Sequence, residues 1–162
     1  MVEIATMTPD DLDAAGDVVA SGEVFQWYGL DRDTARRVLT ETHGQVVVAR
    51  REGMVVGVAV FWVDGPMPIP AYLRILAVNE GYRGQGIGRL LLRYVEEQAF
   101  RRGPNLFLCC TATNRRARQF YEREGYQAVG DVPNLIQAGL DEVLYRKSLG
   151  PIRGYAAPQP SP

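Results

Sequence analysis

The sequence contains almost none of the residues from which metal centres and disulfide frameworks are built. Its 162 residues include two cysteines and one histidine. Cys109 and Cys110 are adjacent, so on a strand they point to opposite faces and a bridge between them would be strained. His43 has no second histidine with which to form a ligand pair. We therefore expect reduced thiols and no metal.

Long apolar runs and a targeting segment are also missing. No run reaches the roughly 18 residues that a membrane span needs. The first eight residues carry neither a basic region nor an apolar core. Apolar residues make up 46% of the chain and charged residues 23%, which excludes intrinsic disorder. These observations predict a soluble, cytoplasmic protein with no membrane partner.

The chain has little net charge, but the charge is unevenly distributed. The formal total is −1, which argues against a surface built to bind nucleic acid. Residues 1–44 hold nine acidic residues against three arginines, a net charge of −6. Residues 83–124 hold nine arginines against four glutamates, a net charge of +5. The second segment suits an anionic ligand, although solvated helix faces explain most of these charges equally well.

The hydrophobic pattern predicts one α/β domain over residues 1–150, followed by a proline-rich, flexible tail over 151–162. The predicted order is β-α-α-β-β-β-α-β-α-β-β, with an irregular connection over 21–30. Strands are expected at residues 2–6, 45–50, 54–63, 71–78, 106–111, 126–130 and 142–147. Helices are expected at 8–20, 31–42, 87–102 and 114–124, with Thr8 as the first N-cap.

Although glycines number 17 overall, their placement is more informative than their number. Gly84, Gly86 and Gly88 stand at alternate positions between a predicted strand and a predicted amphipathic helix. Glycines there let backbone N–H groups converge, and the helix N-terminus adds positive potential. A plain turn needs one glycine, so three favour a phosphate or pyrophosphate site.

Two common phosphate motifs do not fit this segment. A P-loop requires a Lys followed by Ser or Thr, and neither is present. The dinucleotide fingerprint would need glycine at Arg89. A mononucleotide-binding α/β protein is disfavoured because no Ser or Thr follows to hold Mg²⁺. The pattern that fits is R-x-x-G-x-G, beginning at Arg83.

At these residues the sequence resembles the GNAT superfamily of N-acetyltransferases. The segment LAVNEGYRGQGIGRLLL (76–92) matches the family's strand, R-x-x-G-x-G loop and helix. Asn114 followed by FYEREGY (120–126) matches its second motif, and the two occur in the family's order. The resemblance extends over about residues 1–148 and implies a mixed, mostly antiparallel central sheet flanked by helices.

The resemblance implies acetyl-CoA as acyl donor. The loop would bind the pyrophosphate, the preceding strand would pair with the pantetheine arm, and the Val78 N–H would polarise the thioester carbonyl. Asn114 would contact the cofactor arm, although an N-cap role explains it equally well. The implied cofactor-binding residues are Leu76, Ala77, Val78, Arg83, Gly84, Gln85, Gly86, Ile87, Gly88, Arg89, Asn114 and Tyr121.

Tyr121 stands where the family places its general acid, which protonates the departing CoA thiolate. A phenol is still protonated at neutral pH and can donate to a developing anion. The alternative is a core aromatic, because Phe120 and Tyr121 belong to one helical stripe. Tyr126 and Phe120 are assigned to the core.

The general base does not follow the family pattern. Some members place a glutamate on the strand before the glycine loop, where this chain has Tyr-Leu-Arg-Ile (72–75). Others place it on the next strand, where this chain has Cys109. A neutral thiol is a poor base, so the sequence leaves two routes for deprotonation of the amine, through water or through a residue elsewhere. Glu23 is a candidate for the second route, with a solvated surface role as its alternative.

Acceptor selection in the family falls to the connection between the first two helices and to the last hairpin loop. These are residues 22–30 and 131–141 here. The candidate acceptor residues are Glu23, Phe25, Trp27 and Tyr28, which could equally form a packed lid.

The sequence thus predicts an N-acetyltransferase that transfers acetyl from acetyl-CoA to a primary amine of a small molecule, protein or peptide. Direct attack would pass through a tetrahedral intermediate. The alternative is a non-catalytic acyl-CoA-binding domain. GNAT domains are often dimeric, so the resemblance is compatible with a homodimer.

Overall fold

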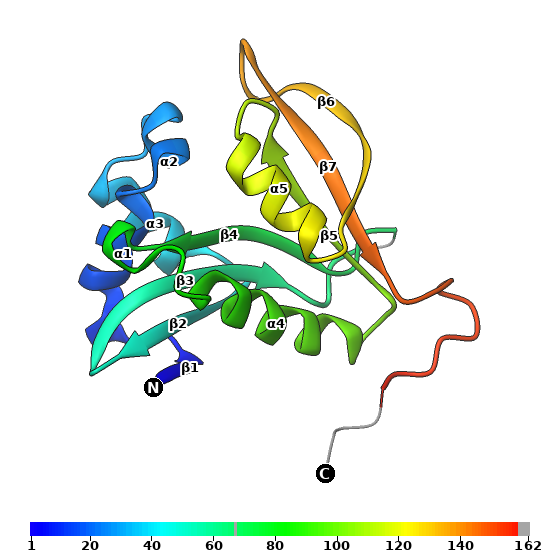
Figure 1. Cartoon of the computed structure of the whole chain (residues 1–162), viewed down its shortest axis with the longest axis horizontal. Coiled ribbons are helices and arrows are strands. Elements are labelled where there is room, and N and C mark those ends of the chain that lie inside the picture. The colour runs from blue at the N-terminus through cyan, green and yellow to red at the C-terminus, as the bar shows by residue number, and fades with distance from the viewer. Residues whose placement is uncertain (67, 159–162) are drawn as a thin grey trace. The chain divides into compact units, whose positions relative to one another are not determined.

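The computed structural model describes residues 1–66 and 68–158. Seven strands are hydrogen-bonded in the order β1-β2-β3-β4-β5-β7-β6, and helices accompany them (Figure 1). The described residues include no helix long and apolar enough to cross a membrane. The chain divides into two compact units, Met1–Phe61 with Arg74–Val95, and Trp62–Leu73 with Glu96–Pro162. The division into one domain and a tail stays a prediction.

The first unit is built on strands that are neighbours in the sheet in the order in which they follow in the chain. It contains β1 (Val2–Thr6), β2 (Gln45–Arg51), β3 (Met54–Trp62) up to Phe61, and β4 (Tyr72–Val78) from Arg74 onward. In register, β1 pairs with β2 and β2 pairs with β3. Residues 56–61 of β3 are all buried. A continuous apolar run of this kind is typical of a strand covered on both faces.

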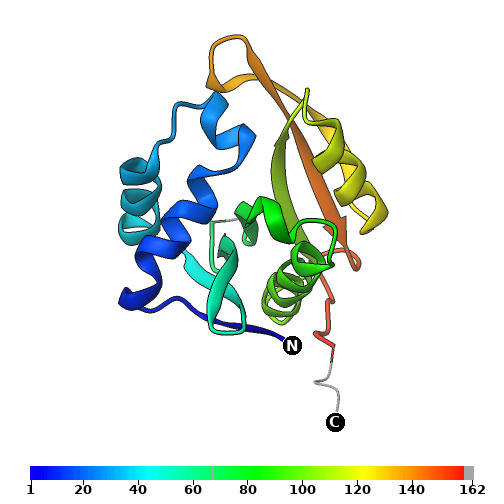
Figure 2. The ribbon, with the colours of Figure 1, turned by 60° about the vertical axis from the view of Figure 1, so that its left-hand side comes forward.

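Three helices connect β1 to β2, one more than the sequence predicted. They are α1 (Leu12–Ala20), α2 (Glu23–Trp27) and α3 (Arg32–Glu41), with a 3-10 turn over Pro9–Asp11. The α1 and α3 helices lie side by side (Figure 2), and Ala15 and Ala35 are fully buried. The short α2 occupies the connection for which no helix was expected, because its five residues are too few to show helical periodicity.

A partly buried ion pair ties the first helical turn to β2. The Asp11 carboxylate accepts hydrogen bonds from the Thr8 N–H and hydroxyl, both at 2.7 Å. It also accepts two from Arg50, at 3.2 and 2.5 Å. Burial works against the charged carboxylate, but these bonds and the Arg50 charge outweigh it and hold the pKa of Asp11 below its usual value.

Asp11→Asn is expected to lower the free energy of unfolding by about 2 kcal/mol at pH 7, because hydrogen bonds to a charged group contribute about 1.5–3 kcal/mol. A group whose pKa is depressed by folding stabilises the fold above its unfolded pKa, and this stabilisation is lost as the pH falls through the folded pKa. The deficit of the variant should therefore shrink in acid. Urea unfolding at pH 7 and pH 3 measures both effects.

Asp17→Asn provides the matched control, because the Arg32–Asp17 pair at 2.7 Å is more than half exposed on both sides. Exposed pairs contribute about 0–1 kcal/mol. Equal destabilisation by the two substitutions would contradict the role assigned to the Asp11–Arg50 pair.

The second unit is built around β5 (Asn105–Thr111), which is parallel to the start of β4 and antiparallel to β7 (Leu140–Ser148). The sheet ends in β6 (Gln127–Gln137), which pairs with β7. The sequence predicted a strand only to residue 130 and a loop from 131 to 141. Pro133 interrupts the strand pattern, and an edge strand tolerates proline because one side of its backbone needs no ladder bond.

Two further helices follow the glycine loop and β5. The first, α4 (Ile87–Phe100), has its first nine residues in the first unit and its end in the second. The second, α5 (Arg115–Arg123), packs beside β7 in the second unit (Figure 1). An aromatic cluster of Phe120, Tyr121, Tyr126 and Tyr145 joins this helix to the strand.

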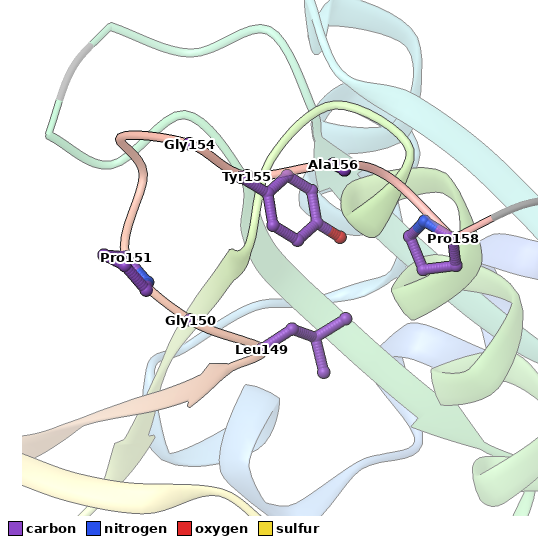
Figure 3. Close-up of a pocket in the computed structure, with 7 residues that line it drawn as sticks. All are labelled: Leu149, Gly150, Pro151, Gly154, Tyr155, Ala156 and Pro158. Atoms are coloured by element: carbon purple, nitrogen blue, oxygen red, sulfur yellow. The ribbon is translucent and has the colours of Figure 1, made fainter.

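The segment after β7 returns to the end of α4. The Tyr155 hydroxyl donates to the Phe100 carbonyl at 2.8 Å. Leu149, Tyr155 and Pro158 are among the residues around a pocket of about 410 Å³ (Figure 3). None of the predicted site residues lines this pocket. Residues 159–162 of the predicted tail lie outside the described part of the chain.

Candidate functional site

The glycine loop of the first unit joins the end of β4 to the start of α4. A 3-10 turn over Glu80–Tyr82 follows the strand, and Asn79 caps it by accepting from the Gly81 N–H at 3.1 Å. The Asn79 N–H donates to the Val56 carbonyl of β3 at 2.9 Å. The beginning of the loop is therefore fixed to the sheet before the glycines are reached.

The three glycines of the motif have different structural roles. Gly84 and Gly86 have positive φ angles of 76° and 81°, a conformation that other residues adopt only with strain. A Cβ atom at either position would meet no atom within 4 Å, so the space beside the backbone is open. Gly88 is the second residue of α4. Gly84 and Gly86 therefore set the path of the loop.

Close packing holds the first turns of α4 against the sheet. A Cβ atom built on Gly57 of β3 would lie 2.8 Å from Leu91 Cδ1 and 3.2 Å from Ile87 Cγ2. Both side chains are fully buried. The N-terminus of a 14-residue helix is thereby directed at the loop, and its free N–H groups and dipole suit an anion.

Side chains hold the loop in shape from two directions. Arg83 Nε donates to the Val78 carbonyl at 3.1 Å, and Gln85 Nε2 donates to the Gly81 carbonyl at 3.1 Å. Arg51 Nη1 donates to Gln85 Oε1 at 2.5 Å, and its guanidinium lies 5.9 Å from the centre of the Tyr82 ring. The motif arginine thus fixes the end of the strand that carries Val78.

Arg51 contacts the glycine loop but belongs to neither sequence motif. It ends β2 beside the β2–β3 turn, and β3 is the neighbour of β4. A predicted β2–β3 hairpin next to the glycine loop is the signal that could have identified it. The glycine loop is therefore held by β2, through Arg51, and by β3, through the Val56 carbonyl.

The candidate acceptor residues lie in and beside α2, in the same unit. Glu23 is exposed, Phe25 and Tyr28 are half-buried, and Trp27 is 43% exposed. No residue of α2 is buried. An exposed Glu23 fits the solvated role better than that of a buried base, and its part in acceptor binding stays a prediction.

In the second unit, Tyr121 lies in the centre of the aromatic cluster. Its ring is 5.2 Å from that of Phe120 and 5.7 Å from that of Tyr126, both edge-to-face. The residue is 9% exposed. Burial, followed by the neighbouring Cys110 and Tyr72, raises the pKa of the Tyr121 phenol. The hydroxyl is therefore a proton donor throughout the neutral range, and packing and acid catalysis remain compatible roles.

A hydrogen-bond network fixes the helix that carries Tyr121. Arg118 Nε donates to the Tyr145 hydroxyl at 3.0 Å, and this hydroxyl donates to Glu122 Oε1 at 2.9 Å. Arg118 Nη1 also donates to the Ala112 carbonyl at 3.1 Å. Since Tyr145 is fully buried on β7, α5 has a defined position on the strand.

Asn114 is the N-cap of α5, one of the two roles that the sequence allowed. Its Oδ1 accepts from the Ala117 N–H at 3.1 Å. A contact with the cofactor arm through its N–H₂ group stays a prediction.

Two substitutions of Asn114 separate these roles. Asp keeps the capping oxygen but loses the amide donor, so Asn114→Asp should retain the unfolding free energy and weaken acetyl-CoA binding about threefold. Asn114→Ala should weaken binding and also cost about 1 kcal/mol of stability. Calorimetric titration and thermal melts measure both quantities. Unchanged affinity in both variants would leave capping as the only role of Asn114.

Cys109 lies on β5, at the position where the resemblance implies a glutamate in some members of the family. It is half-buried and hydrogen-bonded to Tyr72 of β4. Burial and the Glu142 charge raise the pKa of the Cys109 thiol, and the Tyr72 hydrogen bond offsets only part of this rise. Burial and Glu142 also raise the pKa of Cys110, to about 12. Both thiols are neutral at pH 7, and neither is a useful base.

The described residues contain no group of three His, Cys, Asp or Glu side chains that could hold a metal ion. The anion-binding features belong to the glycine loop of the first unit, whereas Asn114 and Tyr121 belong to the second. What this arrangement offers chemically is an N–H-lined loop for a phosphate and a buried phenolic proton donor.

The chain matches the model of the Acetyltransferase (GNAT) family over residues 10–126. It is 36% identical over 95 residues to the N-alpha-acetyltransferase RimI of Mycobacterium tuberculosis. That alignment spans 58% of this chain and 59% of the relative.

Two solved structures show the same fold. A GNAT-family protein from Desulfovibrio desulfuricans is 26% identical, with 93% of this chain and 100% of that chain covered and a TM-score of 0.76. An aminoglycoside 6'-N-acetyltransferase solved with coenzyme A is 19% identical, with 92% and 98% covered and a TM-score of 0.75.

Proposed function

The chain belongs to the acetyltransferase (GNAT) family, and from this premise we propose that it transfers an acetyl group from acetyl-CoA to a primary amine. The observation that carries the proposal is the loop before α4. Gly84 and Gly86 hold positive φ angles with open space beside them, at the N-terminus of a long helix. Backbone N–H groups so placed suit a pyrophosphate.

The residues that would bind acetyl-CoA are those of β4 and the loop. The N–H groups of residues 83–89 would bind the pyrophosphate, and Leu76, Ala77 and Val78 would pair with the pantetheine arm. The coenzyme A in the aminoglycoside acetyltransferase complex agrees with this choice of donor, and the open space beside the glycines leaves room for an anion.

In the proposed reaction the amine attacks the thioester carbonyl directly. The carbon–nitrogen bond forms, a tetrahedral intermediate carries negative charge on oxygen, and the carbon–sulfur bond then breaks. The Val78 N–H would stabilise the oxyanion, and Arg83 holds the carbonyl of the same residue. Tyr121 would give its proton to the leaving thiolate.

The acceptor class is an amine of a small molecule or of a protein or peptide. The RimI relative is an N-alpha-acetyltransferase, so a peptide α-amino group is the first acceptor to test. The exposed side chains Glu23 and Trp27 of α2 are proposed to contact it. The cytoplasmic location predicted from the sequence suits such an acceptor and stays a prediction.

Two measurements test this function. Calorimetric titration should detect binding of acetyl-CoA. Thiol release should then be followed with peptide N-termini, free amino acids, polyamines and aminoglycosides. Failure to bind acetyl-CoA would overturn the proposal. Binding without thiol release for any amine would favour the non-catalytic acyl-CoA-binding alternative. The absence of a glutamate at position 109, where some family members carry their base, supports this alternative.

A further inference from the structure

The loop proposed to bind acetyl-CoA is rich in glycine, and such a loop is unfavourable to order. Glycine loses more conformational freedom on folding than any other residue. A loop that becomes ordered only when its ligand arrives lowers the affinity, because the ordering opposes binding. Gly84 and Gly86 hold positive φ angles, and Gln85 between them is the position that carries a side chain. A contact that fixes Gln85 therefore restrains the most flexible part of the loop.

The Gln85 side chain is held at both of its polar atoms. Its Nε2 donates to the Gly81 carbonyl at 3.1 Å, which connects two parts of the same loop. Its Oε1 accepts from Arg51 Nη1 at 2.5 Å, which connects the loop to β2. Arg51 is therefore the link between the Gln85 side chain and the sheet.

Arg51 reaches the loop from a well-defined position. It is the last residue of β2, and Glu52 and Gly53 follow it with φ angles of 54° and 80°. Two successive positive φ angles are typical of the two-residue turns that join antiparallel strands tightly. The beginning of the loop is fixed to β3 of the same hairpin, because the Asn79 N–H donates to the Val56 carbonyl at 2.9 Å. Arg51 and the loop thus share one support.

The chemistry of the contact suits a permanent connection. The Arg51 guanidinium is a charged donor, and a hydrogen bond from a charged group is stronger than one between two neutral groups. Its centre lies 5.9 Å from the centre of the Tyr82 ring, a distance typical of a cation–π contact. Tyr82 ends the 3-10 turn and Gln85 follows it. Arg51 therefore contacts the loop at two points, on both sides of Gly84.

We propose that Arg51 is a positioning residue of the acetyl-CoA site, which acts through Gln85 to hold the glycine loop in its binding conformation before the ligand arrives. The proposal rests on the function proposed above. The contribution of Arg51 is the ordering of the loop N–H groups, and the pyrophosphate is bound by those groups. Such ordering stabilises the bound ground state and the transition state equally, so its loss raises KM for acetyl-CoA and leaves kcat unchanged.

Arg51→Ala is expected to weaken acetyl-CoA binding about tenfold in calorimetric titration, with kcat within about twofold of the wild type. Gln85→Ala should weaken binding at least as much, because it also removes the bond to Gly81. Adding Arg51→Ala to Gln85→Ala should then have less than a twofold further effect, because the connection is already broken. Arg32→Ala is the control, since it removes an arginine from the exposed pair with Asp17, and it should bind acetyl-CoA like the wild type.

Hydrogen exchange on the free protein tests the ordering without any ligand. The N–H groups of residues 81–83 are hydrogen-bonded within the 3-10 turn and its cap, so their exchange rates report on the loop. Arg51→Ala should speed the exchange of these amides at least about threefold and leave the amides of α3 unchanged.

Three results would overturn the proposal. They are unchanged affinity in the Arg51→Ala variant, a loss of kcat at unchanged affinity, and a further tenfold loss when Arg51→Ala is added to Gln85→Ala. The last would assign Arg51 a direct contact with a phosphate. If Arg51→Ala does not fold, Gln85→Ala decides, because Gln85 is exposed, and wild-type affinity in this variant would overturn the proposal. A wild-type protein that binds no acetyl-CoA would overturn the proposed function, and hydrogen exchange then still tests whether Arg51 orders the loop.

Discussion

Replacing Tyr121 with phenylalanine is expected to lower kcat about 10²-fold, the lower end of the range for general acid–base catalysis. The substitution removes only the hydroxyl, so the ring contacts with Phe120 and Tyr126 remain. Acetyl-CoA affinity should change less than threefold. Steady-state kinetics and calorimetric titration on the same preparation separate the two quantities.

Tyr126→Phe is the matched control, because it removes a hydroxyl from another buried ring of the same cluster. It should leave kcat within about twofold of the wild type. Equal rates for the Tyr121 variant and the wild type would reduce Tyr121 to a packing residue. Because burial raises the pKa of Tyr121, its ionisation should cause no loss of rate below the usual tyrosine pKa of about 10.

Gly86→Val is expected to weaken acetyl-CoA binding about 10²-fold. The φ angle of 81° is unfavourable for any side chain and most of all for a β-branched one. Strain of this kind costs about 1–3 kcal/mol, and the loop can relieve it only by turning its N–H groups away. A loss of about 2.7 kcal/mol corresponds to a factor of 10² in the dissociation constant.

Gly81→Ala is the control for the glycine substitution. A Cβ atom there would lie 3.7 Å from Asn79 Oδ1, an ordinary contact, and the Gly81 N–H that bonds to Asn79 is kept. Affinity for acetyl-CoA should stay within about twofold. A Gly86 variant that binds as tightly as the wild type would show that the loop conformation is not needed for the pyrophosphate.

The order of strands and helices could be predicted because each depends on local signals. The alternation of residues 2–6, the cap at Asn114 and the glycines after β4 are visible within a few positions of one another. The family resemblance added the fold, which the structural neighbours confirm. Two elements could not be predicted from local signals. The five residues of α2 are too few to show helical periodicity, and β6 extends through Pro133 because it is the edge strand of the sheet.

The parts of the site that the sequence did not reveal are held by cross-strand contacts. Arg51 reaches Gln85 across 34 positions of the chain. Arg51 belongs to neither motif, because its contact with the loop depends on how β2 lies in the sheet. The local sequence shows the charged side chain, and only the folded sheet shows its partner.

The hydrogen bond from Tyr155 to the Phe100 carbonyl gives the end of the chain a defined part in the stability of α4. The last carbonyls of a helix have no partner within the helix, and here one is satisfied by a side chain 55 positions downstream. Residues 151–158 then behave as a remote C-cap. Removing them should increase fraying of the last turn of α4, and amide hydrogen exchange would detect this as faster labelling confined to that turn.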